Sequence, residues 1–474
     1  MSASGNPLTL AISGLHYNQL RQHLFPGDGK EAVAIAVCGR SNDDRRESLL
    51  VREIHPIPHA SCRVRTPYRV TWSPEAAIPA LTCAMNGRLA IVKIHSHPNG
   101  VEWFSQIDDE SDTQFFDSVF GWLDTDLRQA SLIMLPCGRL IGRSITQSGL
   151  GKPLADVRMA GDDFIFWRHG ETEAQVPEHA RRIAQIFGEA TYANLRALRV
   201  GVVGCSGTGS VVVEQLARYC VGELVLVDPD FVEHKNLNRI LNSTIDDARN
   251  RVPKVEVMQR AVGAMGLGVN VNVFASDLFN ADVIKALSSC DIVFGCMDSI
   301  DGRHLLNKIA SYYLIPYIDM GVRIDADGNG GVNLVMGAIH TMQPGGSSLL
   351  SRGVYTQQLL NEAFLARGSP ETFAQRVKED YIKGVRVDQP AVISLNMQIA
   401  ATAINELMAR IHPYRLESNG SFAIRRIVLT DPENSTNEHD GRACDTFGLC
   451  VGLGDQQPPL GIPDLGRPRG NTAC

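Results

Sequence analysis

The sequence lacks the features that mark membrane, secreted and nucleic-acid-binding proteins. No apolar run approaches the roughly 18 residues needed to span a bilayer, and the N-terminus has neither the charged segment nor the long apolar core of a secretory signal. A net charge of −7 without a basic tract argues against a nucleic-acid partner. Eleven cysteines scattered over 474 residues are too sparse for a disulfide scaffold. We therefore expect a cytoplasmic protein with neither a membrane nor a nucleic acid as partner.

The composition is that of an ordinary globular protein, with 44% hydrophobic and 20% charged residues. The chain is longer than one hydrophobic core usually supports, which predicts more than one domain. We expect a first domain over residues 1–150, a polar linker over 151–176, a second domain over 177–452, and a Pro/Gly-rich tail over 453–474.

Hydrophobic periodicity separates the two expected domains. Before residue 150, short extended runs mix with helical stretches near 15–24 and 108–123. From Leu198 to Val322, apolar strand-like runs alternate regularly with helical patterns. That alternation predicts a parallel, doubly wound α/β sheet in the second domain.

Two histidines form the most informative motif of the first domain. His95 and His97 follow the apolar run 89–94 and, being two residues apart on an extended backbone, project to the same side. Asp108 follows eleven residues later and can fold back as a third ligand. Two imidazoles and a carboxylate, with a fourth position left to water, are typical of catalytic zinc. The motif predicts a hydrolytic zinc site, in which Ser105 can help to stabilise an oxyanion.

Such a site also needs a base, and Glu31 opens a buried strand at residues 32–37. Taken alone, Glu31 is better explained as a surface residue at a strand end. However, a strand-borne Glu followed by H-S-H-P and S-x-x-D resembles the JAB/MPN isopeptidase family, the JAMM-motif metalloproteases that remove ubiquitin-like proteins. The resemblance covers roughly residues 8–150. It implies a cytidine-deaminase-like α/β fold, zinc bound by His95, His97 and Asp108, Glu31 as general base, and Ser105 at the tetrahedral oxyanion.

A glycine-rich turn opens the second domain. Gly204, Gly207 and Gly209 lie between a strand and a helix, where glycines let the backbone approach phosphates at the helix N-terminus. Asp228 ends the next strand and could accept from ribose hydroxyls. By itself, this pattern fits a dinucleotide-binding Rossmann domain nearly as well.

Residues further along favour a nucleoside triphosphate. Arg239 and Lys254 can neutralise phosphate charge, which a dehydrogenase does not need at this point. Asp298 ends a later strand, where it can hold magnesium or orient an attacking carboxylate. The set resembles the ThiF-type, ubiquitin-activating superfamily of adenylyltransferases, which activate the C-terminal carboxylate of a β-grasp protein as an acyl-adenylate. The resemblance implies ATP and Mg²⁺ in a Rossmann-like domain, with Asp230 at the ribose, Asn236, Arg239 and Lys254 at the phosphates, and Asp298 in catalysis.

The helix before this domain adds a further implication. Residues 182–188 are similar to the family's R-Q-x-x-x-x-G segment, although no Gln follows Arg182. In relatives that arginine reaches the ATP of a dimer partner, so the resemblance implies a homodimer with Arg182 acting in trans. Taken alone, Arg182 is equally well explained as a solvated helix residue.

Two departures from the family pattern concern glycine and cysteine. Ser206 stands where the loop usually has its second glycine, a change that a wider turn tolerates. Many relatives carry P-G-x-x-C-x-x-C, but the corresponding residues 344–351 contain no thiol, and no cysteine occurs between Cys296 and Cys444. A four-thiolate zinc site therefore cannot be built from that region. Either Cys444 or Cys450 forms a thioester, or the adenylate passes directly to a thiol of a downstream partner.

Together, the two resemblances predict one chain with two opposed activities on a ubiquitin-like protein. A zinc peptidase would trim or deconjugate the modifier, and an adenylyltransferase would activate its C-terminus for a conjugating-enzyme-like protein, as in prokaryotic operons that include antiphage systems. The alternative is activation and maturation of a sulfur carrier for cofactor or cysteine synthesis. A binding scaffold with one degenerate half would not require the intact set of candidate residues.

Overall fold

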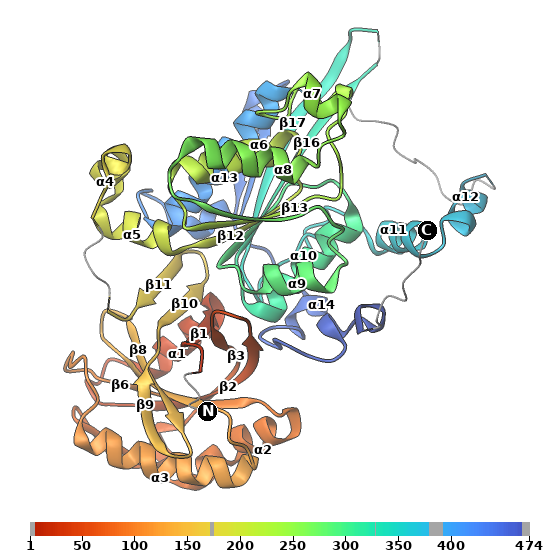
Figure 1. The fold of residues 1–474 in the computed structure, drawn as a ribbon. Coiled ribbons are helices and arrows are strands. Elements are labelled where there is room, and N and C mark those ends of the chain that lie inside the picture. The colour runs from red at the N-terminus through yellow and green to blue at the C-terminus, as the bar shows by residue number, and fades with distance from the viewer. Residues whose placement is uncertain (1–4, 171–174, 328, 379–391, 467–474) are drawn as a thin grey trace. The chain divides into compact units, whose positions relative to one another are not determined.

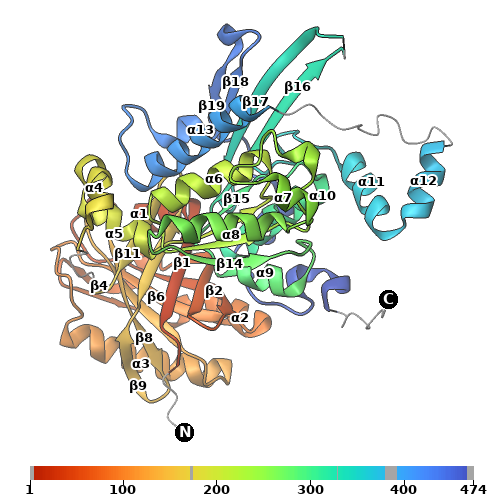
Figure 2. The same cartoon turned by 45° about the horizontal axis from the view of Figure 1, so that its top comes forward.

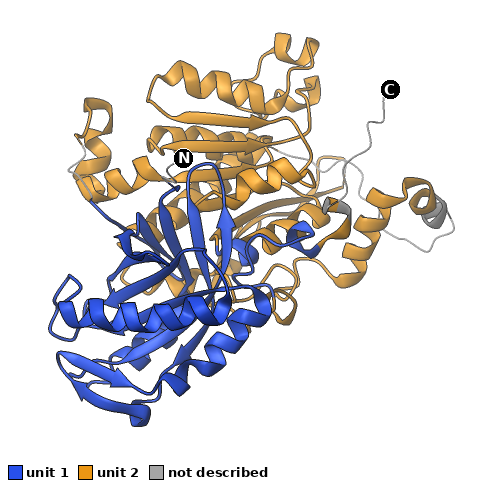
Figure 3. Cartoon of the chain, turned by 60° about the horizontal axis from the view of Figure 1, so that its bottom comes forward, with its two compact units in different colours: residues 1–172, 311–314, 450–461 blue, residues 173–310, 315–449, 462–474 orange. Residues whose placement is uncertain are grey.

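The computed structural model describes residues 5–170, 175–327, 329–378 and 392–466. The chain forms two compact units, coloured separately in Figure 3. Unit 1 consists of residues 1–172, 311–314 and 450–461, and unit 2 of residues 173–310, 315–449 and 462–474. None of the helices in the described ranges combines the length and the apolarity that crossing a bilayer requires.

Unit 1 is built on a nine-stranded mixed sheet in the order β11-β10-β1-β3-β2-β6-β7-β8-β9 (Figure 1). Helix α1 (Gly14–Leu24) packs Leu20 and Leu24 against one face. Helices α2 (Ile78–Gly87) and α3 (Gln106–Leu123) pack against the other face through residues such as Leu81 and Phe116. The strands are β1 (Leu8–Ser13), β2 (Val33–Asn42), β3 (Glu47–Pro56), β6 (Ala90–Ser96), β7 (Gln129–Met134), β8 (Leu140–Thr146), β9 (Gly149–Pro153), β10 (Asp156–Ala160) and β11 (Phe164–Arg168), with a separate hairpin of β4 (Cys62–Thr66) and β5 (Arg69–Trp72).

The structure corrects two predicted boundaries of unit 1. The expected linker over 151–176 contains β10 and β11, and β10 pairs in parallel with β1. β10 escapes notice because Val157 and Met159 alternate with the polar Asp156 and Arg158. The apolar run 164–167 of β11 is short and stands between polar segments, so it shows no clear period. The predicted tail also begins inside unit 1, because Gly454 forms a parallel bridge with Arg40. The rest of that tail, from residue 467, lies outside the described residues.

Unit 2 contains an eight-stranded sheet in the order β14-β13-β12-β15-β16-β17-β18-β19. Its first five strands are parallel, so the predicted doubly wound, Rossmann-like arrangement is confirmed for this part. The strands are β12 (Arg199–Val203), β13 (Glu223–Val227), β14 (Asn270–Phe274), β15 (Ile292–Gly295), β16 (Tyr317–Ala326), β17 (Val332–Met342), β18 (Ile424–Val428) and β19 (Thr436–Glu438). The helices are α4 (Arg181–Phe187), α5 (Glu189–Ala197), α6 (Gly207–Arg218), α7 (Ile245–Arg249), α8 (Lys254–Met265), α9 (Ala281–Ser288), α10 (Ile300–Tyr313), α11 (Gln357–Gly368), α12 (Pro370–Lys378), α13 (Ile393–Ile411) and α14 (Asp445–Gly448).

Three features of unit 2 differ from the prediction or were not predicted. The sheet is not parallel throughout, because β16 turns back into β17 and the remaining pairs are antiparallel. The helix expected over 177–197 is interrupted at Gly188, whose φ of 82° ends α4. Helix α13 packs against α6 and along β16 and β17, as Figure 2 shows. It brings a distant part of the chain to the glycine-rich turn.

The strand order fixes where a site can form in unit 2. The chain runs from β12 outward through β13 to β14, and then returns to β15 on the other side of β12. Such a switch point opens a crevice at the carboxyl ends of the parallel strands. The glycine-rich turn follows β12, and the predicted Asp228 and Asp298 follow β13 and β15.

Candidate metal centre and nucleotide pocket

The three predicted zinc ligands converge in unit 1. His95 belongs to β6, His97 follows the strand, and Asp108 lies in the first turn of α3. The two Nε2 atoms are 3.1 Å apart, and Asp108 approaches His95 Nε2 at 3.0 Å and His97 Nε2 at 3.5 Å. His97 Nδ1 lies 2.8 Å from the carbonyl oxygen of Val101, so the hydrogen on Nδ1 points to that oxygen and Nε2 faces the other two groups. His97 Nε2 and the Asp108 carboxylate therefore face each other, and a proton or a metal ion between them would join them.

The start of α3 holds the Asp108 carboxylate in place. Ser105 is the N-cap of the helix and accepts a hydrogen bond from the Asp108 amide at 3.2 Å. In return, the Ser105 amide and hydroxyl both donate to Asp108 Oδ2 at 2.7 Å. Although burial opposes it, hydrogen bonding to His95 and His97 holds the pKa of Asp108 well below its usual range. The hydroxyl predicted to face an oxyanion is therefore occupied with orienting a ligand.

Glu31 lies beside this cluster and is 4% exposed. It precedes β2, whose pairing of Val33 with His95 brings Glu31 alongside the histidines. Burial raises the pKa of Glu31 to about 7, an effect that the charge of His97 opposes and that of Asp108 reinforces. A carboxyl group that can accept a proton near neutral pH has the property required of a general base.

A buried ion network that the sequence analysis missed supports α3. Lys93 lies two residues before His95 on β6, and its Nζ is 2.8 Å from Asp112 Oδ1. Arg143 of β8 donates to the other oxygen of Asp112 at 2.6 Å and covers the Phe104 ring. A lysine two residues before a ligand histidine shares its face of the strand, and that spacing could have indicated the network.

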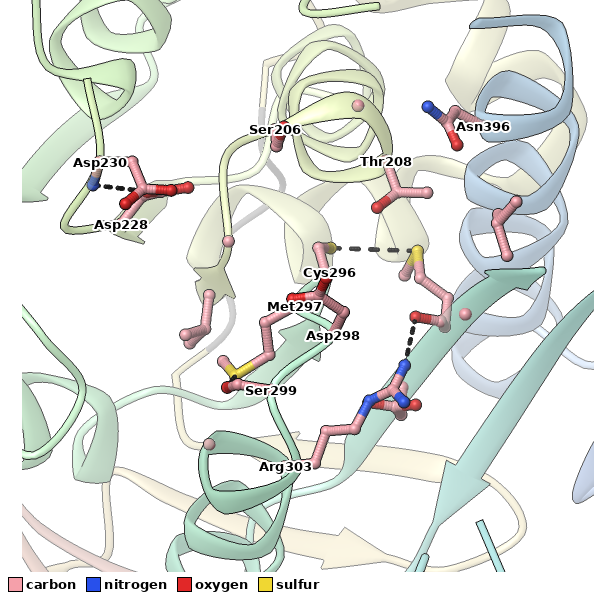
Figure 4. Close-up of a pocket in the computed structure, with 18 of the residues that line it drawn as sticks. Ser206, Thr208, Asp228, Asp230, Cys296, Met297, Asp298, Ser299, Arg303 and Asn396 are labelled. Carbon is pink, nitrogen blue, oxygen red and sulfur yellow. Dashed lines mark hydrogen bonds and ion pairs between the residues drawn. The ribbon is translucent and has the colours of Figure 1, made fainter. Parts of the chain in front are cut away.

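A cavity of about 1060 Å³ lies within unit 2 at the carboxyl ends of the parallel strands (Figure 4). Eight of the residues predicted to handle ATP line it: Gly204, Gly207, Asp228, Asp230, Asn236, Arg239, Lys254 and Asp298. Gly209 and Arg182 are not among its lining residues in the described part of the chain. The structure thus brings together most of the predicted set.

The three glycines serve different purposes. Gly204 has a φ of +90°, and a Cβ there would lie 2.8 Å from the backbone of Cys296. A Cβ on Gly209 would lie 1.8 Å from the carbonyl oxygen of Gly204, so this glycine allows α6 to pack against β12 rather than contacting a ligand. Gly207 lines the cavity itself.

The two aspartates after β13 are also distinct. Asp228 accepts from the amides of Cys205 at 2.6 Å and Asp230 at 2.9 Å, so its oxygens organise the loop. Asp230 is largely exposed, and its carboxylate pairs with Lys254 Nζ at 2.7 Å. Asp230 is therefore the carboxylate better placed to contact a ligand in the cavity.

Arg239, Asn236 and Asp298 occupy different parts of the cavity wall. Arg239 donates to the carbonyl oxygen of Lys235 at 2.9 Å, and Asn236 caps a short helical turn. Asp298 follows β15 and is exposed (Figure 4). Arg182, on α4, is exposed as well.

Residues from later in the chain complete the cavity and were not predicted. Asn396, in the first turn of α13, is 4% exposed, and its Nδ2 would lie 2.2 Å from a Cβ placed on Gly207. Arg367 of α11 lines the cavity and is held by Asp301 at 2.6 Å and Asp277 at 2.9 Å. The strand and turn patterns near the glycine loop contain no signal for either residue.

The two candidate thiols have different environments. Cys444 is 4% exposed in unit 2, where its amide donates to the carbonyl oxygen of Gly346. Cys450 is partly buried in unit 1. Which of them, if either, carries an acyl group stays a prediction.

Comparison with known proteins finds a related family for each unit. The model of the ThiF family matches residues 179–427, and that of prokaryotic homologs of the JAB domain matches residues 15–146. The SAMP-activating enzyme E1 of Haloferax volcanii is 31% identical over 145 residues, which are 30% of this chain and 53% of that protein. The ubiquitin-like modifier-activating enzyme 5 of Drosophila persimilis is 29% identical over 193 residues (37% and 47%). The sulfur carrier protein ThiS adenylyltransferase of Bacillus subtilis is 25% identical over 132 residues (28% and 39%). The chain spans about half or less of the length of these relatives.

Proposed function

This chain belongs to the ThiF family, fused to a Prok-JAB domain, and from that premise we propose that it both activates and releases the C-terminus of a small ubiquitin-like protein. Unit 2 would adenylate the C-terminal carboxylate. Unit 1 would hydrolyse the peptide or isopeptide bond that the modifier's C-terminal carboxyl group forms with another chain. The convergence of Gly207, Arg239 and Lys254 on one cavity is the observation that carries the first activity.

In the adenylation step, a carboxylate oxygen of the modifier attacks the α-phosphorus of ATP, and the bond to the β-phosphate breaks to release pyrophosphate. Arg239 and Lys254 would neutralise charge on the phosphates, where a charge-assisted contact contributes about 1.5–3 kcal/mol. Asp230 would hold the ribose. Asp298 would bind Mg²⁺ or orient the attacking carboxylate. Arg182 would act on the ATP of a second copy in a homodimer.

In the hydrolytic step, His95, His97 and Asp108 would hold zinc, and the donor set of two imidazoles and a carboxylate fits that ion. When bound, zinc would lower the pKa of a water molecule and polarise the scissile carbonyl. Glu31 would take a proton from the attacking water and return it to the leaving amine. Ser105 would keep Asp108 oriented.

Two biological settings fit this chemistry. In the first, which would suit an antiphage conjugation system, the modifier passes to a conjugating-enzyme-like protein, and unit 1 matures the modifier or removes it from its target. In the second, the activated carboxylate receives sulfur and unit 1 matures a sulfur carrier. The names of the relatives support both settings, since one acts on a sulfur carrier and another on a ubiquitin-like modifier.

The test measures the two half-reactions separately on the full chain. ATP–pyrophosphate exchange is expected only with a cognate β-grasp protein and should be lost in Asp298→Ala, while His97→Ala serves as a matched control that keeps exchange. Cleavage of a modifier fusion should be lost in His97→Ala and kept in Asp298→Ala. Exchange without any β-grasp protein, or exchange that persists in Asp298→Ala, would contradict the assignment. Mass spectrometry of the product then separates an isopeptide from a thiocarboxylate.

A further inference from the structure

A second group of metal-ligand side chains lies in unit 1, outside the proposed active site. Glu53 and His55 belong to β3, and Cys83 belongs to α2. His55 Nε2 is 3.2 Å from Glu53 Oε2, and Cys83 Sγ is 3.7 Å from the same oxygen. All three ligand atoms lie within 4.8 Å of one another. They supply one nitrogen, one oxygen and one sulfur, each a type that zinc accepts.

Two of the three spacings, 3.2 Å and 3.7 Å, are close to the edges of a tetrahedral site. With zinc–nitrogen and zinc–oxygen bonds of about 2.0–2.2 Å and a zinc–sulfur bond of about 2.3 Å, neighbouring ligands lie roughly 3.3–3.6 Å apart. His55 Nε2 is buried and makes no hydrogen bond within the described residues, so a polar partner for this atom is the Glu53 Oε2 atom 3.2 Å away. Arg52 lies 3.7 Å from Glu53 Oε1, which leaves Oε2 directed toward the histidine and the thiol.

The group is also accessible to an entering ion. The Glu53 side chain is 44% exposed and that of His55 is 26% exposed. The exposed Glu53 carboxylate can therefore meet an ion from solvent, and a water molecule can fill the fourth position. The proposed active site differs in this respect, because His95 is 2% exposed.

A metal ion bound by this group would affect the β4–β5 hairpin, which lies between His55 and Cys83 in the sequence. That hairpin contacts Glu31, since the Glu31 amide donates to the carbonyl oxygen of Thr66 at 2.9 Å and Arg65 Nε donates to the carbonyl oxygen of Glu31 at 2.9 Å. A metal ion joining β3 to α2 would close the base of the loop that holds Glu31.

We propose that Glu53, His55 and Cys83 bind a second zinc ion, which fixes the β4–β5 hairpin against Glu31. The Cys83 thiol binds as a thiolate and releases its proton to solvent, so the site is predicted to load more tightly as pH rises. The proposal does not depend on any activity of unit 2.

Cobalt provides the test, because a thiolate bound to Co²⁺ gives a near-ultraviolet charge-transfer band that imidazole and carboxylate ligands do not give. The His95, His97 and Asp108 set contains no thiol, so a band that is lost in Cys83→Ser would report the second site. The full chain stripped of metal is titrated with Co²⁺ alongside Cys83→Ser, with Cys137→Ser as the control at an exposed cysteine of the same unit. The band is expected in the full chain and in Cys137→Ser, and its loss is expected in Cys83→Ser.

Zinc content gives an independent measure. Two zinc equivalents are expected in the full chain, one in His97→Ala and one in Cys83→Ser. If Cys83→Ser does not fold, Glu53→Gln retains the thiol and is expected to weaken Co²⁺ binding at this band by at least about tenfold, the lower end of the effect seen when even an outer partner is lost. A single zinc equivalent in the full chain, a cobalt band that survives Cys83→Ser, or an unchanged affinity in Glu53→Gln would overturn the proposal.

Discussion

Nε2 of His95 and Nε2 of His97 lie 3.1 Å apart, and both face the carboxylate of Asp108. The carbonyl oxygen of Val101 accepts the hydrogen on His97 Nδ1, which fixes the ring orientation. Nitrogen and oxygen atoms that carry lone pairs repel one another at this distance unless a proton or a metal ion lies between them. A proton or a metal ion shared by these groups therefore stabilises the arrangement.

The first prediction concerns this cluster. We expect His97→Ala to lose one equivalent of zinc and to reduce cleavage of a modifier fusion by more than the roughly 10–100-fold that follows loss of an outer partner. Zinc is measured by atomic emission and cleavage by gel, with His169→Ala as the control at an exposed histidine of the same unit. Full cleavage by His97→Ala would remove this histidine from the ligand set.

The second prediction separates the base from the metal ligands. We expect Glu31→Gln to retain zinc and to lower the cleavage rate by about 10²–10⁴-fold, because the amide cannot accept the proton. The control is Glu102→Gln, at a side chain that is 57% exposed. A Glu31→Gln protein that cleaves at the wild-type rate would show that another group accepts the proton.

The third prediction concerns stability and pH in unit 2. Burial lowers the pKa of His304 to about 4, and Lys308 adds to this effect. Because the unfolded chain binds a proton near pH 6.5 and the folded chain does not, stability is fully present above pH 6.5 and falls as pH drops toward 4. Between pH 7 and pH 5 this group should cost roughly 1–2 kcal/mol.

Urea unfolding at pH 7 and pH 5 checks this expectation. His304→Phe can keep the ring contacts with Tyr355 and Phe447 while removing the titrating group. The variant should lose less stability than the wild type between the two pH values. Equal losses in the two proteins would contradict the assignment, and His439→Gln provides a comparison at an exposed histidine.

The candidate sites differ in how far the sequence revealed them. The candidate ligands His95, His97 and Asp108 fall within a span of fourteen residues that joins a strand end to a helix start, so local geometry alone brings them together. Asn396 reaches the glycine loop only because α13 packs on α6, a contact between residues nearly 190 positions apart that no local pattern encodes. The group of Glu53, His55 and Cys83 was not predicted for the same reason, because it forms only where α2 packs near β3.

In the fold, too, local patterns were predicted and features that depend on distant pairing were missed. Regular alternation of strands and helices predicted the parallel part of unit 2, because each βα step buries its apolar residues in a repeated way. β10 and β11 were missed because each has only five residues, too few to show a clear period within an otherwise polar stretch. β10 becomes part of the sheet by pairing with β1, which lies at the opposite end of the same unit's sequence, and β11 by pairing with β10.

The fourth prediction concerns Arg182, which is exposed and is absent from the described lining of the cavity in its own chain. If it acts in trans, Arg182→Ala and Asp298→Ala should each lose exchange. A mixture that forms heterodimers should recover up to roughly a quarter of wild-type exchange, since half of the dimers would carry one intact site. Absence of recovery, with heterodimers demonstrated by differential tags, would argue against action of Arg182 in trans.

The fifth prediction uses Gly207 and Asn396. Gly207 does not have a positive φ, so alanine is compatible with its backbone, and the obstacle is the Asn396 amide at 2.2 Å from the added Cβ. We expect Gly207→Ala to raise the ATP KM by roughly 5- to 100-fold, in line with about 1–3 kcal/mol for overpacking. Adding Asn396→Ala should restore part of this loss by removing the amide.

Gly209→Ala is the matched control for that pair. Its Cβ would lie 1.8 Å from the carbonyl oxygen of Gly204, which is backbone and does not move when Asn396 is shortened. Asn396→Ala should therefore rescue Gly207→Ala and leave Gly209→Ala defective. Rescue of both variants would mean that Asn396 acts on the loop as a whole, and rescue of neither would mean that its amide contributes to ATP binding directly.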